Sequence, residues 1–450
     1  MMDYIMIRSV LLDKMREKIK NHASRIYWTQ TEIHAFQNAH LKKILNHVLL
    51  YSSYYQKRCS NSMGLTRIIP STKKDIMDNW DNIVCVPELT REIAEDHLRQ
   101  YKNGQITNPF FRDNYYITAT GGSSGLRGLF VWDLEYFATV GYAAFRYQYL
   151  DDQKKLLNRP KKIAVLTAPT LIHASTPLFT MTLNDNDEAI HFPADLNMNE
   201  LCKKLNQAQP TDLIGYSSII TELAYHALGG SLSITPQRVS TNSEPLHSES
   251  RDVVRKAWGV EINNMWGSVE MGMAGVENDE HCGLYLSDDL LIIELVDNFL
   301  QPVKRSSDVK KLLITNLFNY AFPLIRYVVD DSVYINKALN SGYRIAKDIE
   351  GRSDDWFVYK EGIKIHPMVF RAILGQQQSI IEYQVEQTVC GAICRLILDQ
   401  DINCITLAKE ISSALKNAGL TSPNIEIEIL SSLPRHKETG KLKRFIPKLT

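Results

Sequence analysis

The sequence predicts an α/β protein with a large N-terminal domain that contains mixed sheets and a small α+β domain at the C-terminus. At 450 residues the chain exceeds the size that one hydrophobic core can serve, so two or more domains are expected. Strand-like apolar runs alternate with helical stretches through the middle of the chain, which is typical of α/β domains. From about residue 380 this alternation changes to a short set of strands around one helix.

The elements of the large domain follow from the spacing of apolar residues. Apolar positions at steps of three to five predict a helix near residues 32–50. Further helices are predicted over 135–149 and 248–258, whereas continuous apolar runs predict strands at 163–168 and 290–296. The order of these elements gives a sheet covered by helices.

The C-terminal part of the chain predicts a β-β-α-β module. Two strands are expected over 380–388 and 393–398, an amphipathic helix over 405–418 and a last strand over 425–430. The domain boundary is expected near Gly351–Asp355, a polar stretch that carries Gly, Ser and three charges.

Composition excludes several classes of function. The 51 basic and 51 acidic residues cancel, which removes the general electrostatic argument for binding nucleic acid or an anionic membrane. The sequence has no apolar run long enough to span a bilayer, and its N-terminus lacks the apolar core of a signal peptide. Seven cysteines without regular spacing are typical of reduced thiols. A cytoplasmic location is therefore expected.

Residues 118–128 form a loop rich in glycine and hydroxyl groups. Glycine allows backbone N–H groups to approach and surround a phosphate, and Ser and Thr add donors. Gly121–Gly125 also fits the G-x-S-x-G pattern of a hydrolase nucleophile, but the additional Gly and Thr favour phosphate over a single exposed nucleophile. The P-loop pattern of Walker-type NTPases does not occur in the sequence.

Four further motifs follow this loop along the chain, namely Trp266–Glu270, Arg326–Asp331, Gly351–Asp355 and Leu433–Lys441. Together the five blocks resemble the adenylate-forming superfamily, in particular its phenylacetate–CoA ligase branch. The likeness extends over nearly the whole chain, because three more stretches look like family segments, at 69–76, 212–218 and 242–245.

The resemblance implies both a fold and an activity. It implies a large, multi-subdomain adenylate-forming domain over residues 1–353, which binds nucleotide and acid, and a small mobile domain over 354–450, which carries a catalytic lysine. Such enzymes activate a carboxylic acid with ATP and Mg²⁺ to an acyl-adenylate. They then transfer the acyl group to a thiol, in this branch that of coenzyme A.

The same resemblance implies roles for individual residues. Lys441 and Glu270 would be catalytic, Glu270 would also bind Mg²⁺, and Asp354 would be the hinge. The acid pocket would include Tyr136, Phe137, Tyr216 and Met271. The implied ATP- and AMP-binding residues are Thr120, Gly121, Gly122, Ser123, Ser124, Gly125, Arg127, Ser243, Glu244, Pro245, Trp266, Gly267, Ser268, Asp331 and Arg352.

The chain departs from the family pattern at several positions. Arg127 follows Leu126 where a lysine is usual, so a guanidinium would supply the charge. Val269 occupies the position of a hydroxyl residue, and Ser268 lies one residue earlier.

Two assignments stay open for similar reasons. Val328-Val329-Asp330 stand where the family has Arg-Thr-Gly before Asp331, which leaves two adjacent acids, so the sequence does not decide which of them binds ribose. The last block is one residue longer than usual, which makes Lys437 and Lys443 rivals of Lys441.

Three functional alternatives remain at this stage. The acid, an aromatic or other small organic acid, passes either to coenzyme A or to the phosphopantetheine arm of a carrier protein; alternatively, the chain is a degenerate relative that binds nucleotide without turnover. A homodimer is compatible with the branch. A zinc site at His281-Cys282 is disfavoured because Tyr285 stands where another ligand is expected and the sequence lacks a Cys-x-x-Cys pair.

Overall fold

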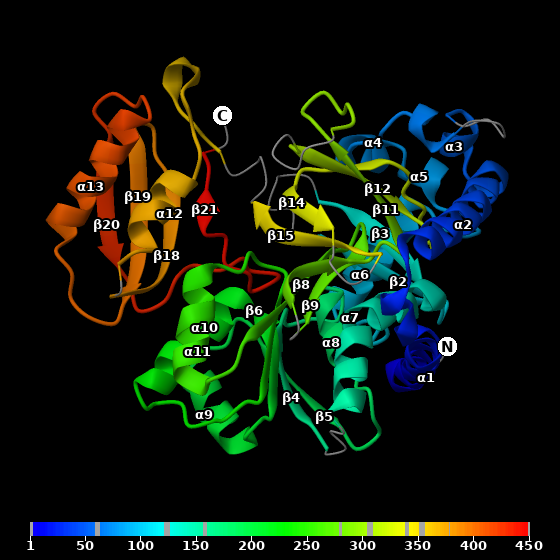
Figure 1. The fold of residues 1–450 in the computed structure, drawn as a ribbon, viewed down its shortest axis with the longest axis horizontal. Helices are drawn as coiled ribbons and strands as arrows, with labels where there is room; N and C mark the ends of the chain where they lie inside the picture. The colour runs from blue at the N-terminus through cyan, green and yellow to red at the C-terminus, as the bar shows by residue number, and fades with distance from the viewer. Residues whose placement is uncertain are drawn as a thin grey trace.

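The computed structural model has a large N-terminal part and a smaller C-terminal part, seen at the right and left of Figure 1. The structure describes residues 3–58, 64–120, 127–155, 160–278, 281–303, 309–337, 342–350, 356–377 and 379–448.

A nine-stranded mixed sheet forms the centre of the large part. The five strands β8, β7, β6, β4 and β5 pair in parallel, and the remaining strands continue the sheet from β8 in antiparallel pairs. In sheet order the strands are β14 (Ser332–Lys337), β15 (Arg344–Glu350), β10 (His281–Leu286), β9 (Gly272–Asn278), β8 (Ile262–Ser268), β7 (Arg238–Asn242), β6 (Asp212–Tyr216), β4 (Lys162–Thr167) and β5 (Glu188–Pro193).

Helices pack against the sheet and form two separate hydrophobic clusters with it. Helices α9 (Met198–Ala208), α10 (Ser217–Leu228) and α11 (Ser248–Trp258) share one cluster with the parallel strands, as their side-by-side position in Figure 1 shows. Helices α1 (Tyr4–His22) and α7 (Leu134–Lys154) share another cluster with β8, β9 and β10. The helices predicted over 135–149 and 248–258 and the strand predicted at 163–168 are thus confirmed.

Two three-stranded antiparallel sheets and a group of N-terminal helices complete the large part. Helix α2 (Gln30–Tyr51), predicted over 32–50, begins with a capping box in which Thr29 and Glu32 satisfy each other's backbone N–H groups. The sheets are β1 (Phe110–Phe111), β2 (Tyr115–Ala119) and β3 (Leu129–Asp133), and β11 (Leu291–Val296), β12 (Lys311–Asn316) and β13 (Tyr327–Val329). The other helices are η1 (Ala23–Tyr27), α3 (Ser53–Gln56), η2 (Leu65–Arg67), α4 (Lys73–Asp78), α5 (Trp80–Ile83), α6 (Arg91–Lys102) and α8 (Ser175–Phe179).

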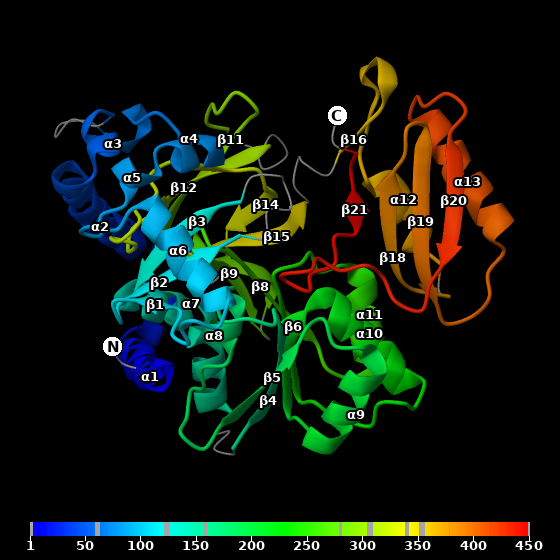
Figure 2. The same cartoon turned by 180° about the vertical axis from the view of Figure 1, so that it is seen from behind.

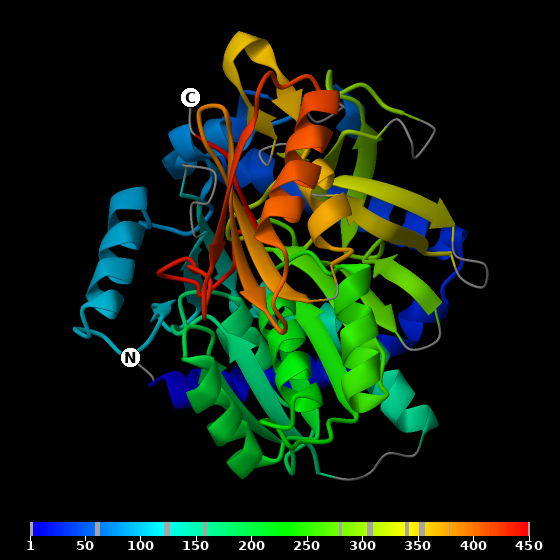
Figure 3. The ribbon, with the colours of Figure 1, turned by 90° about the vertical axis from the view of Figure 1, so that its left-hand side faces the viewer.

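The C-terminal part has its own core and confirms the predicted β-β-α-β order. Strands β18 (Ile380–Gln387), β19 (Gly391–Leu398) and β20 (Asn424–Ile429) pack against α13 (Cys404–Asn417), which lies across one face of the sheet in Figure 3. A fourth strand, β21 (Phe445–Ile446), pairs in parallel with β18; it has two residues and therefore shows no periodicity in the sequence. The remaining elements are β16 (Phe357–Val358), η5 (Lys360–Gly362), β17 (Lys364–Ile365) and α12 (Met368–Leu374).

The predicted domain boundary at 353/354 lies outside the described residues, so it stays a prediction. In the part of the chain that the structure describes, no helix is both long and apolar enough to cross a lipid bilayer.

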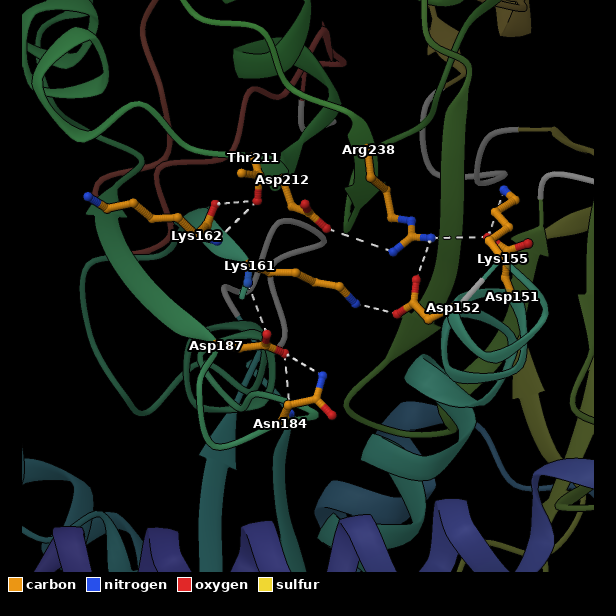
Figure 4. Close-up of polar contacts among 10 residues, drawn as sticks. All are labelled: Asp151, Asp152, Lys155, Lys161, Lys162, Asn184, Asp187, Thr211, Asp212 and Arg238. Carbon is orange, nitrogen blue, oxygen red and sulfur yellow. Dashed lines mark hydrogen bonds and ion pairs between the residues drawn. The ribbon is translucent and has the colours of Figure 1, made fainter. Parts of the chain in front are cut away.

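A buried charge network closes the amino ends of the parallel strands (Figure 4). Arg238, the first residue of β7, lies 3.1 Å from carboxylate oxygens of both Asp151 and Asp152 and 3.8 Å from Asp212 at the start of β6. Asp152 also pairs with Lys161, which precedes β4. Burial raises the pKa of Asp212, and the charge of Arg238 opposes that rise. One guanidinium therefore neutralises carboxylates from one helix, α7, and one strand, β6.

Removing Arg238 should destabilise the large part strongly. Arg238→Ala leaves buried carboxylates without their shared cation, and breaking such a pair costs about 3–5 kcal/mol. Urea denaturation followed by tryptophan fluorescence measures the loss. Arg255→Ala is the control, because the partners of Arg255 are Asp252 and Glu261 on the surface, and it should leave the transition unchanged. Equal shifts in both variants would contradict the role of the network.

Candidate active site

The predicted site residues gather at the carboxyl ends of β6, β7 and β8, the edge opposite the charge network. Tyr216 ends β6, Ser243 directly follows β7, and Trp266 lies near the end of β8. Ligands of parallel α/β sheets bind at this edge because loops from neighbouring strands converge there. Figure 2 shows the C-terminal loop running past the same edge beside α10.

Lys73 connects two of the predicted motifs. Its Nζ donates a hydrogen bond of 3.1 Å to Oγ1 of Thr120 and lies 3.9 Å from Oε1 of Glu270. Lys73 is the first residue of α4, where Thr72 caps the helix. Gly128 makes room for it, because a Cβ there would lie 2.9 Å from the Lys73 Cε. The lysine belongs to the family-like stretch 69–76, but nothing in its spacing from Thr120 or Glu270 marked it as a site residue.

Thr120 and Gly128 close the base of the glycine-rich loop. The Thr120 N–H donates to the Gly128 carbonyl at 2.9 Å, and the Gly128 N–H donates to the Thr120 hydroxyl at 2.8 Å. Gly121, Gly122, Ser123, Ser124 and Gly125 lie outside the described residues, so their phosphate contacts stay predictions. So do the roles of Arg352 and of Asp354, which lie outside the described residues too.

Arg127 turns toward helix α6. Its guanidinium lies 3.2 Å from the carboxylate of Glu95, and both side chains are about one-third exposed. Lys73 is consequently the cation that contacts Thr120 at the loop base, whereas the phosphate role of Arg127 stays a prediction.

Trp266 and Asp331 contact each other directly. The indole Nε1–H donates a 3.2 Å hydrogen bond to Oδ2 of Asp331, and the residues are 8% and 7% exposed. Asp330 instead lies 2.6 Å from Lys311. The structure therefore distinguishes the two adjacent acids, because only Asp331 lies beside the aromatic residue that the resemblance assigns to adenine.

In the turn at the end of β8, Ser268 and Val269 form hydrogen bonds within the protein. The Ser268 hydroxyl accepts a hydrogen bond from the Met271 N–H at 3.4 Å, and the Val269 carbonyl accepts one from Trp132 Nε1 at 3.0 Å. A Cβ at Gly267 would lie 2.5 Å from the carbonyl oxygen of Gly272, so this close approach of two backbones requires glycine. Ser268 thus stabilises its own turn, and its predicted nucleotide contact remains untested.

Glu244 links the large part to the C-terminal loop. Its Oε2 accepts from the Ser218 N–H at 3.0 Å, and its Oε1 accepts from the Leu442 N–H at 2.7 Å. The neighbouring Ser243 adopts a left-handed backbone at φ +65°, and the Pro245 carbonyl accepts from the Ser217 hydroxyl at 2.8 Å. The Glu244 carboxylate therefore orders backbone at the site, a function that its sequence position did not reveal.

Lys441 reaches the same edge from the C-terminal part. Its Nζ lies 5.7 Å from the ring centre of the fully buried Tyr216. Of its two rivals, Lys437 is exposed, and the Lys443 carbonyl accepts a hydrogen bond from Gln384 of β18. Lys441 thus lies beside Tyr216, and its catalytic role stays a prediction.

His173 is a buried neighbour of Lys441 that sequence reasoning missed. It precedes α8, is 8% exposed, and its Nε2 has no hydrogen-bond partner among the described residues. Burial and, to a smaller extent, the charge of Lys441 lower the pKa of His173 to about 4. A single histidine between two elements gives no sequence signal.

The predicted acid-pocket residues are all buried, but they do not share one environment. Phe137 packs edge to face against Tyr116 and Trp132, as part of an aromatic core. Tyr136 accepts a hydrogen bond from Asn316, and a Cβ at Gly272 would lie 2.5 Å from the Tyr136 hydroxyl. Met271 joins the same core cluster, which leaves Tyr216 as the pocket candidate next to Lys441.

Comparisons with known proteins agree on one fold. No protein-family model matches the chain. It is 24% identical to Protein CapK of Staphylococcus aureus over 430 residues, 92% of this chain and 89% of that protein. It is 27% identical to the phenylacetate-coenzyme A ligase of Thermus thermophilus over 164 residues, 34% of this chain and 37% of that enzyme.

Solved structures extend the match to three dimensions. 2-Hydroxyisobutyryl-CoA ligase in its postadenylation state superposes with a TM-score of 0.71 at 17% identity, covering 94% of this chain and 91% of that one. ATP-bound MatB from Rhodopseudomonas palustris gives 0.51 at 15% identity, with 72% of this chain and 65% of that one covered. The chain therefore has the fold of the adenylate-forming acyl-CoA ligases. Its similarity to CapK and to a phenylacetate-coenzyme A ligase supports the branch that the motifs predict.

The superposition differs between two structures of the same ligase. The TM-score is 0.71 for the postadenylation state but 0.57 for the thioesterification state of the same enzyme, at 17% identity in both cases.

Removing the charge of Lys441 should raise the pKa of His173. In Lys441→Met the pKa is expected to rise from about 4 but to stay below the ordinary value of 6.5, because burial is the larger cause. NMR titration of ring-labelled histidine measures it. Lys443→Met removes a nearby charge of the same sign and serves as the control, which should leave His173 unchanged. A His173 pKa that is the same in Lys441→Met and in the unmodified chain would contradict this placement of the ammonium.

Proposed function

We propose that this chain is an acid–thiol ligase that activates a carboxylic acid with ATP and transfers the acyl group to coenzyme A. The observation that carries the proposal is the meeting of Lys441 with the carboxyl edge of the large sheet. There Lys441 lies beside Tyr216. Two further contacts, Lys73 with Thr120 and Trp266 with Asp331, involve residues of the motifs that resemble nucleotide-binding segments.

The first half-reaction joins two anions. A carboxylate oxygen of the acid attacks the α-phosphorus of ATP, the bond from that phosphorus to the bridging oxygen breaks, and pyrophosphate leaves. Ammonium groups brought close to the reacting anions offset their repulsion, and Lys441 and Lys73 are the candidates for this role. Trp266 would stack on adenine while Asp331 accepts from the ribose hydroxyls.

Mg²⁺ fits this site through Glu270. Its carboxylate is 9% exposed and lies beside Lys73 next to Thr120, and Mg²⁺ is commonly held by one or two carboxylates together with substrate phosphates. When bound, the ion would neutralise phosphate charge. Among the described residues no group of three or more metal-binding side chains occurs, which is compatible with a site completed by substrate.

The second half-reaction needs a different arrangement of the two parts. A thiolate attacks the acyl carbon, and AMP leaves with the oxygen that it shared with the acyl group. We propose that the C-terminal domain, residues 354–450, turns about Asp354 between the steps and that the cytoplasm is the site of action. Coenzyme A is the proposed acceptor because relatives named above are coenzyme A ligases.

A panel of acids tests the proposal. With ATP and Mg²⁺, pyrophosphate release should appear with one class of small or aromatic acids, and AMP and a thioester should follow when coenzyme A is added. If a thioester forms only with a holo-carrier protein, the acceptor is the phosphopantetheine thiol of that protein and not coenzyme A. If the chain binds nucleotide but releases no pyrophosphate with any acid, it is a non-catalytic nucleotide-binding protein.

Lys441→Ala should separate the half-reactions. Adenylate formation is expected to fall about 100-fold or more, the size of effect seen when one stabilising group is lost, while thioester formation from a pre-made acyl-adenylate stays largely intact. Lys437→Ala, which removes an exposed rival lysine, is the control and should leave both rates unchanged. Equal losses in both half-reactions would contradict the assignment.

A further inference from the structure

Arg435 lies where the C-terminal loop meets helix α10. Its Nη1 donates to the Ser218 hydroxyl at 2.8 Å and to the Gly440 carbonyl at 3.3 Å, and its Nη2 lies 3.5 Å from Oε2 of Glu222. One guanidinium therefore contacts the large part and also the residue that immediately precedes Lys441.

The residue that follows Lys441 is held from the same place. The Leu442 N–H donates to Glu244, whose other carboxylate oxygen accepts from the Ser218 N–H. Both neighbours of Lys441 are thus fixed to the first turn of α10, one through Arg435 and the other through Glu244. Gly440 fits tightly as well, at φ +67°, because a Cβ there would lie 2.8 Å from the Cβ of Ala194.

The base of the loop does not depend on Arg435. Gln384 of β18 donates to the carbonyls of Pro434 and Lys443 at 3.1 and 3.0 Å. Arg444 pairs with Glu382 of the same strand. Both ends of the loop are therefore tied to the C-terminal sheet, whereas its tip contacts the large part, where Glu438 also lies 2.7 Å from Lys102 of α6.

The charges at this contact are mostly buried. The side chains of Arg435 and Glu222 are 17% and 9% exposed. Burial raises the pKa of Glu222, and Arg435 opposes the rise. A carboxylate in such a place needs its cation, and a lysine could not reproduce the two-pronged donation to Ser218 and Glu222.

We propose that Arg435 is a positioning residue that fixes the loop tip, and with it the Lys441 ammonium, against the large part for the first half-reaction. The inference rests on the proposed function and adds a residue to it. It also assigns Glu222 and Ser218 of α10 as the docking site that favours the adenylating arrangement.

Kinetics of the half-reactions test the role of Arg435. Arg435→Ala should slow adenylate formation about 10- to 100-fold in kcat, because small misplacement of a catalytic group has effects of that size, with less than about 3-fold change in KM for ATP. Thioester formation from isolated acyl-adenylate should be unchanged. Arg435→Lys should restore only part of the loss.

Arg395→Ala is the matched control. Arg395 is 17% exposed, like Arg435, but its partners Glu386, Glu428 and Gln384 all lie inside the C-terminal part, and none belongs to the loop tip. Arg395→Ala should therefore not slow adenylate formation selectively relative to thioester formation. Equal loss of both half-reactions in Arg435→Ala, or wild-type adenylation in that variant, would overturn the proposal.

Hydrogen exchange provides a test that does not need turnover. In Arg435→Ala, amides of residues 436–442 should exchange at least about tenfold faster than in the unmodified chain, while those of β18 and β19 keep their rates. Arg395→Ala should leave the 436–442 segment unchanged. An unmodified chain that adenylates no acid would remove the proposed function, but the exchange result would still decide whether Arg435 holds the loop. Unchanged exchange at 436–442 in Arg435→Ala would overturn the docking itself.

Discussion

Parallel pairing of β6, β7 and β8 brings the ends of three strands to one edge of the large sheet, and the candidate site depends on that edge. Tyr216, Ser243 and Trp266 are distant in the chain, but each lies at or close to the carboxyl end of one of these neighbouring strands. The sheet provides position, whereas the charges come from elsewhere. Lys73 approaches from α4 and Lys441 from the C-terminal loop, so the candidate site combines three segments that are distant in sequence.

The two edges formed by the ends of these strands carry different arrangements of charged groups. At the amino ends, Arg238 is surrounded by carboxylates from α7 and β6, and the charges are matched within the protein. At the carboxyl ends, two ammonium groups are present: Lys73 lies 3.9 Å from Glu270, and Lys441 lies beside the Tyr216 ring. An edge that must receive phosphates and a carboxylate benefits from cations, because their charge then offsets the repulsion of the incoming anions.

Local patterns predicted most elements but not the contacts between them. The helices at 32–50 and 248–258 and the C-terminal module were visible because periodicity and capping act within a few residues. Lys73 and Arg435 were missed as site residues, since their partners lie far away in sequence and are brought near by tertiary packing alone. Likewise, the sequence could not distinguish Asp330 from Asp331, a choice that depends on which carboxylate faces Trp266.

Under the proposed function, Lys441 serves the first step and withdraws for the second, so its contacts need to be specific but few. The C-terminal sheet keeps its own core, and Gln384 and Arg444 hold the base of the loop within that part. The loop tip is bound to the large part through Arg435, Leu442 and Glu438, which pairs with Lys102 of α6. Arg371 of α12 also lies 3.7 Å from Glu249 of α11. Charge-assisted hydrogen bonds suit this contact, because their strength depends on direction and they can be exchanged for water when the parts separate. A large apolar interface would hold the arrangement more firmly and oppose the turn that we propose for the second step.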